Sequence, residues 1–203
     1  MSEPTLNRAQ RRKLKTRQKL LETTARILAE ESYEALTIKA ITEEADVGYG
    51  TFYLHFTDKD DIVWQVTETL IAQGNQLFKA QFAHLSPLDR EFESLKLFFE
   101  IAKHNKKNML TVLGRDGSPV LSARYKDAVV ASNAENLRAI PHMESALGVP
   151  IEFAANFFTG AVLRLAAWWL ENDIDYSPQQ MAEYYFQLLA NWDKVESSQQ
   201  SES

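Results

Sequence analysis

The chain has no cysteine among its 203 residues. Disulfide bonds, thiol catalysis and thiolate metal sites are therefore excluded, and the composition fits a reducing compartment such as the cytosol. The chain also lacks a long apolar run, because the most apolar stretch, residues 161–170, is too short to cross a bilayer and contains Arg164. No apolar segment of the secretory type stands near the N-terminus. We expect a soluble, cytoplasmic protein without membrane contact.

The sequence shows no strict alternation of apolar and polar residues, the pattern that predicts β-strands. Apolar residues instead recur at intervals of three and four along most of the chain, which predicts an all-α fold. We expect about nine helices, at residues 16–31, 38–45, 48–56, 58–82, 87–104, around 109–113, at 119–139, 151–169 and 178–195. The expected architecture is a three-helix N-terminal domain, residues 15–60, followed by a helical bundle, residues 61–195.

Basic residues outnumber acidic residues at the start of the chain but not in the remainder. The net charge is -6, yet residues 1–20 carry seven Lys and Arg against Glu3 alone, so this segment has a charge of +6 and the remainder -12. A basic arm on an acidic body would restrict a polyanion to one end of the molecule. Charge alone fits a solvated tail equally well. We predict that residues 1–14 are a disordered basic arm and residues 196–203 a disordered tail.

Residues 37–56 have the form of a helix-turn-helix, because two short helical patterns meet at residues 45–48, a segment of poor helix propensity. At 100° per residue, Phe52 and Phe56 share the apolar face of the second helix and should lie in the core. Tyr49 stands in the exposed first turn, where such helices approach base edges. Tyr53 and His55 lie on opposite flanks of the apolar face, and Gly50, Thr51 and Leu54 point away from it.

A second strong helix start follows at residues 57–62. Asp58 can cap the helix, and Asp61 stands at the capping-box position. Lys59 is a cation in a first turn, where acids are favoured. It is either a solvated surface lysine or a phosphate contact assisted by the positive end of the helix.

Residues 47–62, Val-Gly-Tyr-Gly-Thr-Phe-Tyr-Leu-His-Phe-Thr-Asp-Lys-Asp-Asp-Ile, resemble the recognition helix and the following junction of the TetR family of bacterial transcriptional regulators. The resemblance covers about residues 17–63, and many positions agree over a fixed spacing. Residues 168–171 followed by Ser177 and Pro178 also resemble the last two helices of some TetR-type ligand domains. The resemblance implies a regulator, by family habit a repressor, that binds a palindromic operator as a homodimer and is released by a small-molecule effector.

The resemblance also implies a set of DNA-binding residues. Thr37 and Lys39 would face DNA, with Lys39 reaching a base, and Tyr49 and Thr51 would enter the major groove. The phosphate contacts would be Tyr53, His55 and Lys59, and the same surface includes Gly48 and Gly50. Three positions depart from the family pattern: Ser32 and Asp46 stand where glycine is usual, and Gly48 where a capping Ser or Thr is common.

The last two helices are more apolar than one core requires. The spacing of apolar residues is heptad-like, with a second line at Phe153, Phe157, Ala161 and Trp168, so we predict a symmetric dimer through a four-helix bundle. The alternative is that both helices are central in the monomer core. The predicted interface residues are Ile151, Ala155, Phe158, Val162, Leu165, Trp169, Met181, Tyr185, Leu188 and Trp192.

An effector pocket is predicted among the C-terminal helices, because aromatic residues and methionine exceed what a small helical core requires. Residues of this kind are more often plain core than ligand contacts, and the candidate lining residues are Phe98, Phe99, Met109, Leu113, Tyr125, Phe157 and Trp168.

Two other classes of function remain to be weighed. An all-helical enzyme is disfavoured, because His55, His84, His104 and His142 are scattered and no nucleophile or Glu-x-x-His motif is present. We therefore assign no catalytic residue, no metal ligand and no cofactor. A TetR-like module that binds another protein without DNA is the second alternative, and the presence of Tyr49, Tyr53 and Lys59 argues against it.

Overall fold

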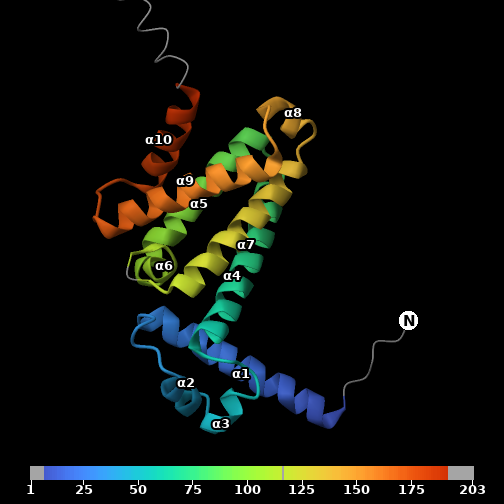
Figure 1. The fold of residues 1–203 in the computed structure, drawn as a ribbon, viewed down its shortest axis with the longest axis vertical. Helices are drawn as coiled ribbons and strands as arrows, with labels where there is room; N and C mark the ends of the chain where they lie inside the picture. Colours follow the sequence, from blue (N-terminus) through green and yellow to red (C-terminus); the bar gives the residue numbers. More distant parts are fainter. Residues whose placement is uncertain (1–6, 116, 192–203) are drawn as a thin grey trace, which may run out of the picture.

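The computed structural model describes residues 7–115 and 117–191 (Figure 1). This part of the chain forms ten helices and no strand, so the all-α prediction is confirmed. The N-terminal unit, residues 7–56, contains α1 (Arg8–Glu30), α2 (Ile38–Glu44) and α3 (Tyr49–Phe52). The remainder, the body, contains α4 (Lys59–Phe82), α5 (Pro87–His104), α6 (Lys106–Leu113), α7 (Pro119–Arg138), α8 (Met143–Leu147), α9 (Ile151–Glu171) and α10 (Pro178–Ala190).

Most helices begin after an Asn, Asp, Ser or Thr residue, the types that commonly cap helix N-termini. Side chains at six N-cap positions accept a hydrogen bond from a backbone N–H of the first turn, as expected for such residues. These caps are Asn7, Thr37, Asp58, Ser86, Ser118 and Ser177. Proline follows directly at positions 87, 119 and 178, where its missing N–H costs nothing. The predicted helices at 58–82, 87–104 and 119–139 are therefore confirmed to within a residue.

Three boundaries differ from the predictions. α1 begins at Arg8 rather than Thr16, because Asn7 and Gln10 form a reciprocal capping box, so the prediction of a disordered arm is wrong for residues 8–14. α3 is shorter than predicted and continues only as turns that end at Phe56. α8, between His142 and Gly148, was not predicted. Residues 1–6 and the predicted tail, residues 196–203, lie outside the described residues, as does the end of the helix predicted at 178–195.

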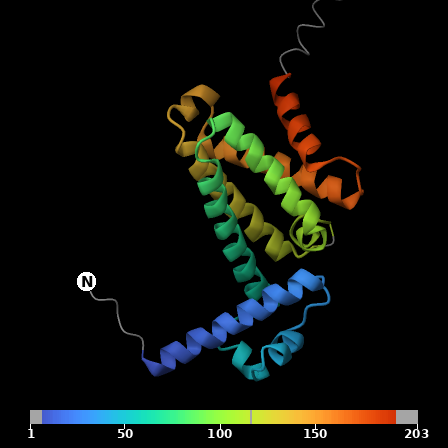
Figure 2. The same cartoon turned by 180° about the vertical axis from the view of Figure 1, so that it is seen from behind.

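One hydrophobic core extends through both parts of the molecule. It contains Leu20, Ile41 and Phe52 from the N-terminal unit together with Val112 and Leu121 from α6 and α7. α4 leaves the N-terminal unit after crossing α1 and runs up into the body (Figures 1 and 2). A second core joins α5, α9 and α10. The N-terminal unit is therefore packed against the body and does not hang from a flexible linker.

The predicted dimer residues form largely the core of the monomer. Ile151, Ala155, Trp169 and Met181 are buried within a single chain, so this part of the interface prediction is wrong. Phe158, Val162, Leu165 and Tyr185 are half-buried, Leu188 is exposed, and Trp192 lies outside the described residues. α9 instead exposes the second apolar line, with Phe153 61% and Phe157 57% exposed. Both lines of α9 are apolar, so periodicity alone did not distinguish the buried one.

The predicted pocket residues do not surround one cavity. Phe99 and Tyr125 are buried in the core, and Phe98, Met109 and Leu113 pack against it. An open cavity of about 190 Å³ lies between α6, α7 and α9 and shares only Leu113 with the predicted set. Its lining residues are Val112, Leu113, Ser122, Lys126, Leu163, Arg164 and Ala167. Phe157 and Trp168 are exposed and do not line this cavity, so their place in a pocket stays a prediction.

By length and composition alone, α9 could cross a membrane, since its mean hydropathy is 1.2. Among the described residues it is the one helix of this kind. Its length exceeds that of the run 161–170 considered in the sequence. Nine of its residues are buried against other helices, which is the behaviour of a core helix.

Candidate DNA-binding surface

The turn between α2 and α3 is built by local backbone hydrogen bonds. The N–H of Val47 donates to the carbonyl oxygen of Thr42 at 3.0 Å, and Asp46 adopts a left-handed conformation with φ of 48°. Aspartate tolerates this conformation better than most residues. Ser32 does not have a positive φ, so the strain considered for that position is not incurred. The two departures from glycine therefore leave the turn intact.

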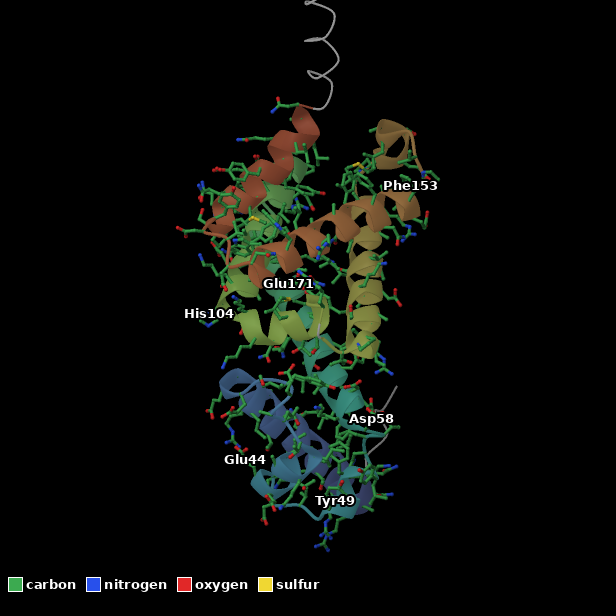
Figure 3. The ribbon with its side chains drawn as sticks, turned by 60° about the vertical axis from the view of Figure 1, so that its left-hand side comes forward. Glu44, Tyr49, Asp58, His104, Phe153 and Glu171 are labelled. Carbon is green, nitrogen blue, oxygen red and sulfur yellow. The ribbon has the colours of Figure 1, made fainter. Side chains whose placement is uncertain are left out.

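α3 has one face in the core and one face in solvent. Phe52 is 0% and Phe56 2% exposed, which confirms the predicted inner face. Tyr49 and Tyr53 are 55% and 49% exposed on the other side, and Figure 3 shows Tyr49 at the extreme end of the molecule. Leu54 is also exposed. Two aromatic side chains in solvent beside a well-formed core indicate a surface that contacts another molecule.

The two exposed tyrosines hold each other in place. Their rings meet edge to face with centroids 5.6 Å apart, and their hydroxyl oxygens are 3.2 Å apart. The hydrogen bond with Tyr49 raises the pKa of the Tyr53 hydroxyl above its usual value of 10.0. The Tyr53 hydroxyl therefore stays protonated at neutral pH and can donate a hydrogen bond to an acceptor such as a phosphate.

The remaining predicted contacts lie around this pair. Thr37 and Lys39 are exposed at the start of α2; the Thr37 hydroxyl oxygen caps the helix, and the Lys39 ammonium is 3.8 Å from exposed Glu43. An exposed pair of this kind contributes little, so Lys39 remains available. Gly48 and Gly50 are exposed, and no side chain crowds Gly50. Thr51 is half-buried next to Gly48.

His55 is half-buried, and its Nδ1 atom has no hydrogen-bond partner among the described residues. Burial lowers its pKa below 6.5, and the nearby charges of Lys13 and Arg17 lower it further. Arg17 also lies over the Phe56 ring, 5.5 Å from its centroid. Lys13 was predicted in a disordered arm, so its place beside His55 was missed, although the Asn7 capping box is visible in the sequence.

Lys59 does not point freely into solvent. Its ammonium donates a hydrogen bond to the carbonyl oxygen of Tyr33 at 3.1 Å and lies 3.8 Å above the centre of the Tyr33 ring. The Tyr33 hydroxyl in turn donates to Asp60, which also accepts from the Ser118 hydroxyl at 3.1 Å. In the free protein Lys59 therefore fastens the loop between α1 and α2 to α4, a role that the sequence did not indicate.

Two family models match the chain, one over the helix-turn-helix and one over the body. Residues 20–66 match the model of bacterial regulatory proteins of the tetR family, and residues 89–191, more than half of the chain, match the model of the TetR transcriptional regulator C-terminal region. The chain belongs to the TetR family of transcriptional regulators. The helix-turn-helix of α2 and α3 is thus the DNA-binding element of a TetR regulator.

Individual relatives agree with the family assignment. The chain is 25% identical over 127 residues to an uncharacterised HTH-type transcriptional regulator of Haemophilus influenzae, a match that covers 63% of this chain and 57% of the relative. A TetR-family regulator of Syntrophomonas wolfei superposes with a TM-score of 0.65 at 19% identity, covering 88% and 94% of the two chains. FadR of Bacillus subtilis, solved with stearoyl-CoA, superposes with a TM-score of 0.62 at 18% identity, covering 85% and 96%. At these identities the two structures support the fold alone.

Proposed function

We propose that this TetR regulator is a cytoplasmic, non-enzymatic repressor that binds a palindromic operator as a homodimer and leaves it when a small molecule binds the body. The observation that carries the DNA-binding role is the division of α3 into a buried side, at Phe52, and an exposed side that presents Tyr49 and Tyr53 at the end of the molecule. α1, which carries exposed cations, lies at the same end (Figure 1). Positive charge at this end favours a polyanion.

We assign the site residues two kinds of role. Lys39 and Tyr49 would contact base edges in the major groove, with Thr37, Gly48, Gly50 and Thr51 close to the duplex. Tyr53 and His55 would bind phosphates and fix the docking register. Lys59 would reach a phosphate only by leaving the Tyr33 carbonyl, so we expect it to contribute less than Tyr53.

The dimer is proposed to form through the exposed apolar side of α9 and α10. On α9 this side presents Phe153, Phe157 and Trp168, the last 38% exposed, and α10 also exposes Leu188, at 61%. Exposed aromatic and aliphatic residues in such number are unusual for a monomer surface. The proposed dimer has to hold two α3 helices about 34 Å apart, because the half-sites of a palindromic operator are one turn of DNA apart.

The effector response rests on the family and on structural relatives. FadR of Bacillus subtilis was solved with stearoyl-CoA, and a regulator of Saccharomonospora viridis with choline. These ligands are chemically unlike, so they support a small-molecule response in this chain without naming its effector. The cavity between α6, α7 and α9 is a candidate site, because α6 also touches the N-terminal unit: the Asn108 amide donates to the carbonyl oxygen of Leu28.

A mobility-shift titration with the DNA upstream of the protein's own coding sequence tests the proposal. We expect a sequence-specific complex that weakens as salt rises, because phosphate contacts release counterions. A chain that forms no such complex but co-purifies with a stoichiometric protein partner would instead be an interaction module.

Two single substitutions separate reading from positioning. Lys39→Ala should relax preference at one base pair, whereas Tyr53→Ala should weaken binding to all sequences by a similar factor. Binding to a panel of single-base operator variants measures both. The division of roles is wrong if the two variants give the same profile across the panel.

A further inference from the structure

The first half of α1 is helical without being packed. Every residue from Asn7 to Lys15 is exposed, and the buried residues of the helix begin at Leu20. The Asn7–Gln10 capping box fixes its start. This segment is therefore a projecting helix that the core does not require.

Most cations of this segment share one side of the helix. Arg8, Arg11, Arg12, Lys15 and Lys19 follow the spacing i, i+3, i+4, i+7 and i+11, which confines them to an arc of about 100°. We call these five residues the basic stripe. No acidic residue occurs between positions 7 and 21, and within the described residues no member of the stripe forms an ion pair. Farther along the same side, Arg26 does pair with Glu44.

The stripe is electrostatically unfavourable in the free protein. Like charges three and four positions apart on a helix repel each other, so the arrangement lowers the stability of a segment whose residues are all exposed. A bound polyanion would remove this repulsion. The rest of the chain carries a charge of -12 beyond residue 20, so the excess of positive charge is confined to the start of the chain.

The half of α1 that carries the basic stripe lies at the same end of the molecule as α3 (Figures 1 and 2). α1 slopes so that its N-terminal half reaches the level of α3 and projects sideways beyond it (Figures 1 and 2). On another side of the same helix, Lys13 and Arg17 are close enough to His55 to influence its ionisation. A duplex docked on α3 would continue past the projecting half of α1.

We infer that the basic stripe is a second DNA contact, which binds the phosphate backbone flanking each half-site, outside the base pairs that α3 contacts. This inference rests on the proposed operator binding. Arg8 and Lys19 are about 16 Å apart along the helix axis, and a duplex presents on the order of ten phosphate charges over that length. The contact adds affinity and salt dependence without adding sequence preference.

The test compares the full chain with a stripe variant, Arg8→Gln, Arg11→Gln, Arg12→Gln and Lys15→Gln. A matched control removes four exposed cations of the body that lie outside the cavity between α6, α7 and α9, Lys79→Gln, Lys103→Gln, Lys107→Gln and Arg138→Gln. Binding is measured by fluorescence anisotropy between 50 and 200 mM salt, on the operator alone, on the operator with ten flanking base pairs on each side, and on a scrambled duplex of the longer length.

In the stripe variant we expect the slope of log K against log[salt] to be shallower by at least about 2, one lost phosphate contact per protomer at roughly 0.9 each. The preference for operator over scrambled DNA should not change. Removing the flanks should weaken the wild type at least about fivefold and leave the stripe variant nearly unchanged. The body control should behave as wild type.

Two results would overturn the inference: a stripe variant with the slope of the body control, or a wild type that binds short and long operators equally. A second variant, Arg8→Lys, Arg11→Lys and Arg12→Lys, keeps the charge and should keep the wild-type slope, which separates lost charge from altered folding. A wild type that shows no preference for operator over scrambled DNA would refute the proposed function instead, while the slopes would still report on the stripe.

Discussion

Asp60 is the residue at which the N-terminal unit, the start of α4 and the start of α7 meet. Its half-buried carboxylate accepts hydrogen bonds from the Tyr33 hydroxyl and from Ser118. Burial, and then the hydrogen bond to Asp60, raise the pKa of Tyr33 above its usual 10.0, so the phenol remains a donor. Ser118 in the body and Tyr33 in the loop before α2 therefore share one hydrogen-bond acceptor, the Asp60 carboxylate.

Replacing Asp60 with alanine should lower the free energy of unfolding by about 2 kcal/mol, because two partly buried donors lose their acceptor. Urea denaturation followed by circular dichroism measures this change. Asp175→Ala, at an exposed position, is the control and should cost less than about 0.5 kcal/mol. Equal stability of the two variants would show that the Asp60 hydrogen bonds do not hold the parts together.

His55 should make operator binding dependent on pH. Burial, Lys13 and Arg17 lower its pKa below 6.5, so the free protein carries a neutral imidazole at pH 7.5. A phosphate beside the ring would favour the charged form, so the complex takes up a proton and affinity should rise between pH 8 and pH 6, by less than about tenfold per pH unit for each protomer.

The sign is opposite for the stability of the free protein. Because the unfolded chain binds a proton at this histidine more readily than the folded chain does, the free energy of unfolding should decrease as pH falls below 6.5. In His55→Gln both dependences should become shallower, as seen in anisotropy and denaturation series across the same pH range. An unchanged pH dependence of operator binding in this variant would remove His55 from the phosphate contacts.

The sequence predicted which side chains of the helix-turn-helix are buried, but it did not predict the contacts of Lys59 and Ser118. The burial of Phe52 and Phe56 followed from their four-residue spacing, which the turns after α3 preserve because the N–H of Phe56 donates a hydrogen bond to the carbonyl oxygen of Phe52. The contacts of Lys59 did not follow, because its partner Tyr33 lies 26 positions away and only tertiary packing brings the two together. The same reason hid Ser118, whose hydroxyl reaches Asp60 across 58 positions.

At the scale of elements, capping residues predicted more than hydrophobic periodicity. The start of α4 followed from Asp58, and the starts of α5, α7 and α10 followed from the prolines at positions 87, 119 and 178. α1 was assigned too late because its first half has no apolar stripe, although Asn7 and Gln10 have the spacing of a capping box. α9 has two apolar lines that periodicity does not distinguish, because which line is buried depends on its packing against α7 and α5.

α3 offers a test that separates folding from DNA contact. A Cβ atom at Gly50 would meet nothing within 4 Å, and the same is true at Gly74 in α4. Neither glycine has a positive φ. Gly50→Ala and Gly74→Ala should each stabilise the protein by about 0.5–1 kcal/mol, because alanine is the better helix former.

The two alanine variants should differ in operator binding. At Gly50 the added methyl group lies on the side of α3 that we place against the duplex, so affinity should fall at least about fivefold, whereas Gly74→Ala should bind as wild type. Thermal denaturation and anisotropy measure the two effects separately. If Gly50→Ala keeps full affinity, the backbone of α3 does not approach the DNA closely at this position.

At the scale of the whole molecule, the exposed apolar surface and the DNA-binding surface lie far apart. Figure 3 places Phe153 and Tyr49 at opposite ends. Because the N-terminal unit shares a core with α6 and α7, the spacing of two α3 helices in a dimer depends on how the bodies pair. Loss of the dimer should therefore weaken operator binding without any change in the N-terminal unit.

Phe157→Glu should disrupt the dimer and leave the fold of the protomer intact, because this side chain is 57% exposed within one chain. Removing a buried phenylalanine from an interface costs about 1.5–3 kcal/mol in each protomer, and burying a carboxylate adds to that, so the dimer should dissociate at least about tenfold more readily. Sedimentation velocity over a concentration series measures the dissociation, and operator affinity should fall in parallel. Leu88→Glu, at a 67% exposed position on α5, is the matched control and should remain dimeric. A Phe157→Glu protein that stays dimeric and binds the operator normally would place the twofold axis away from this side of α9.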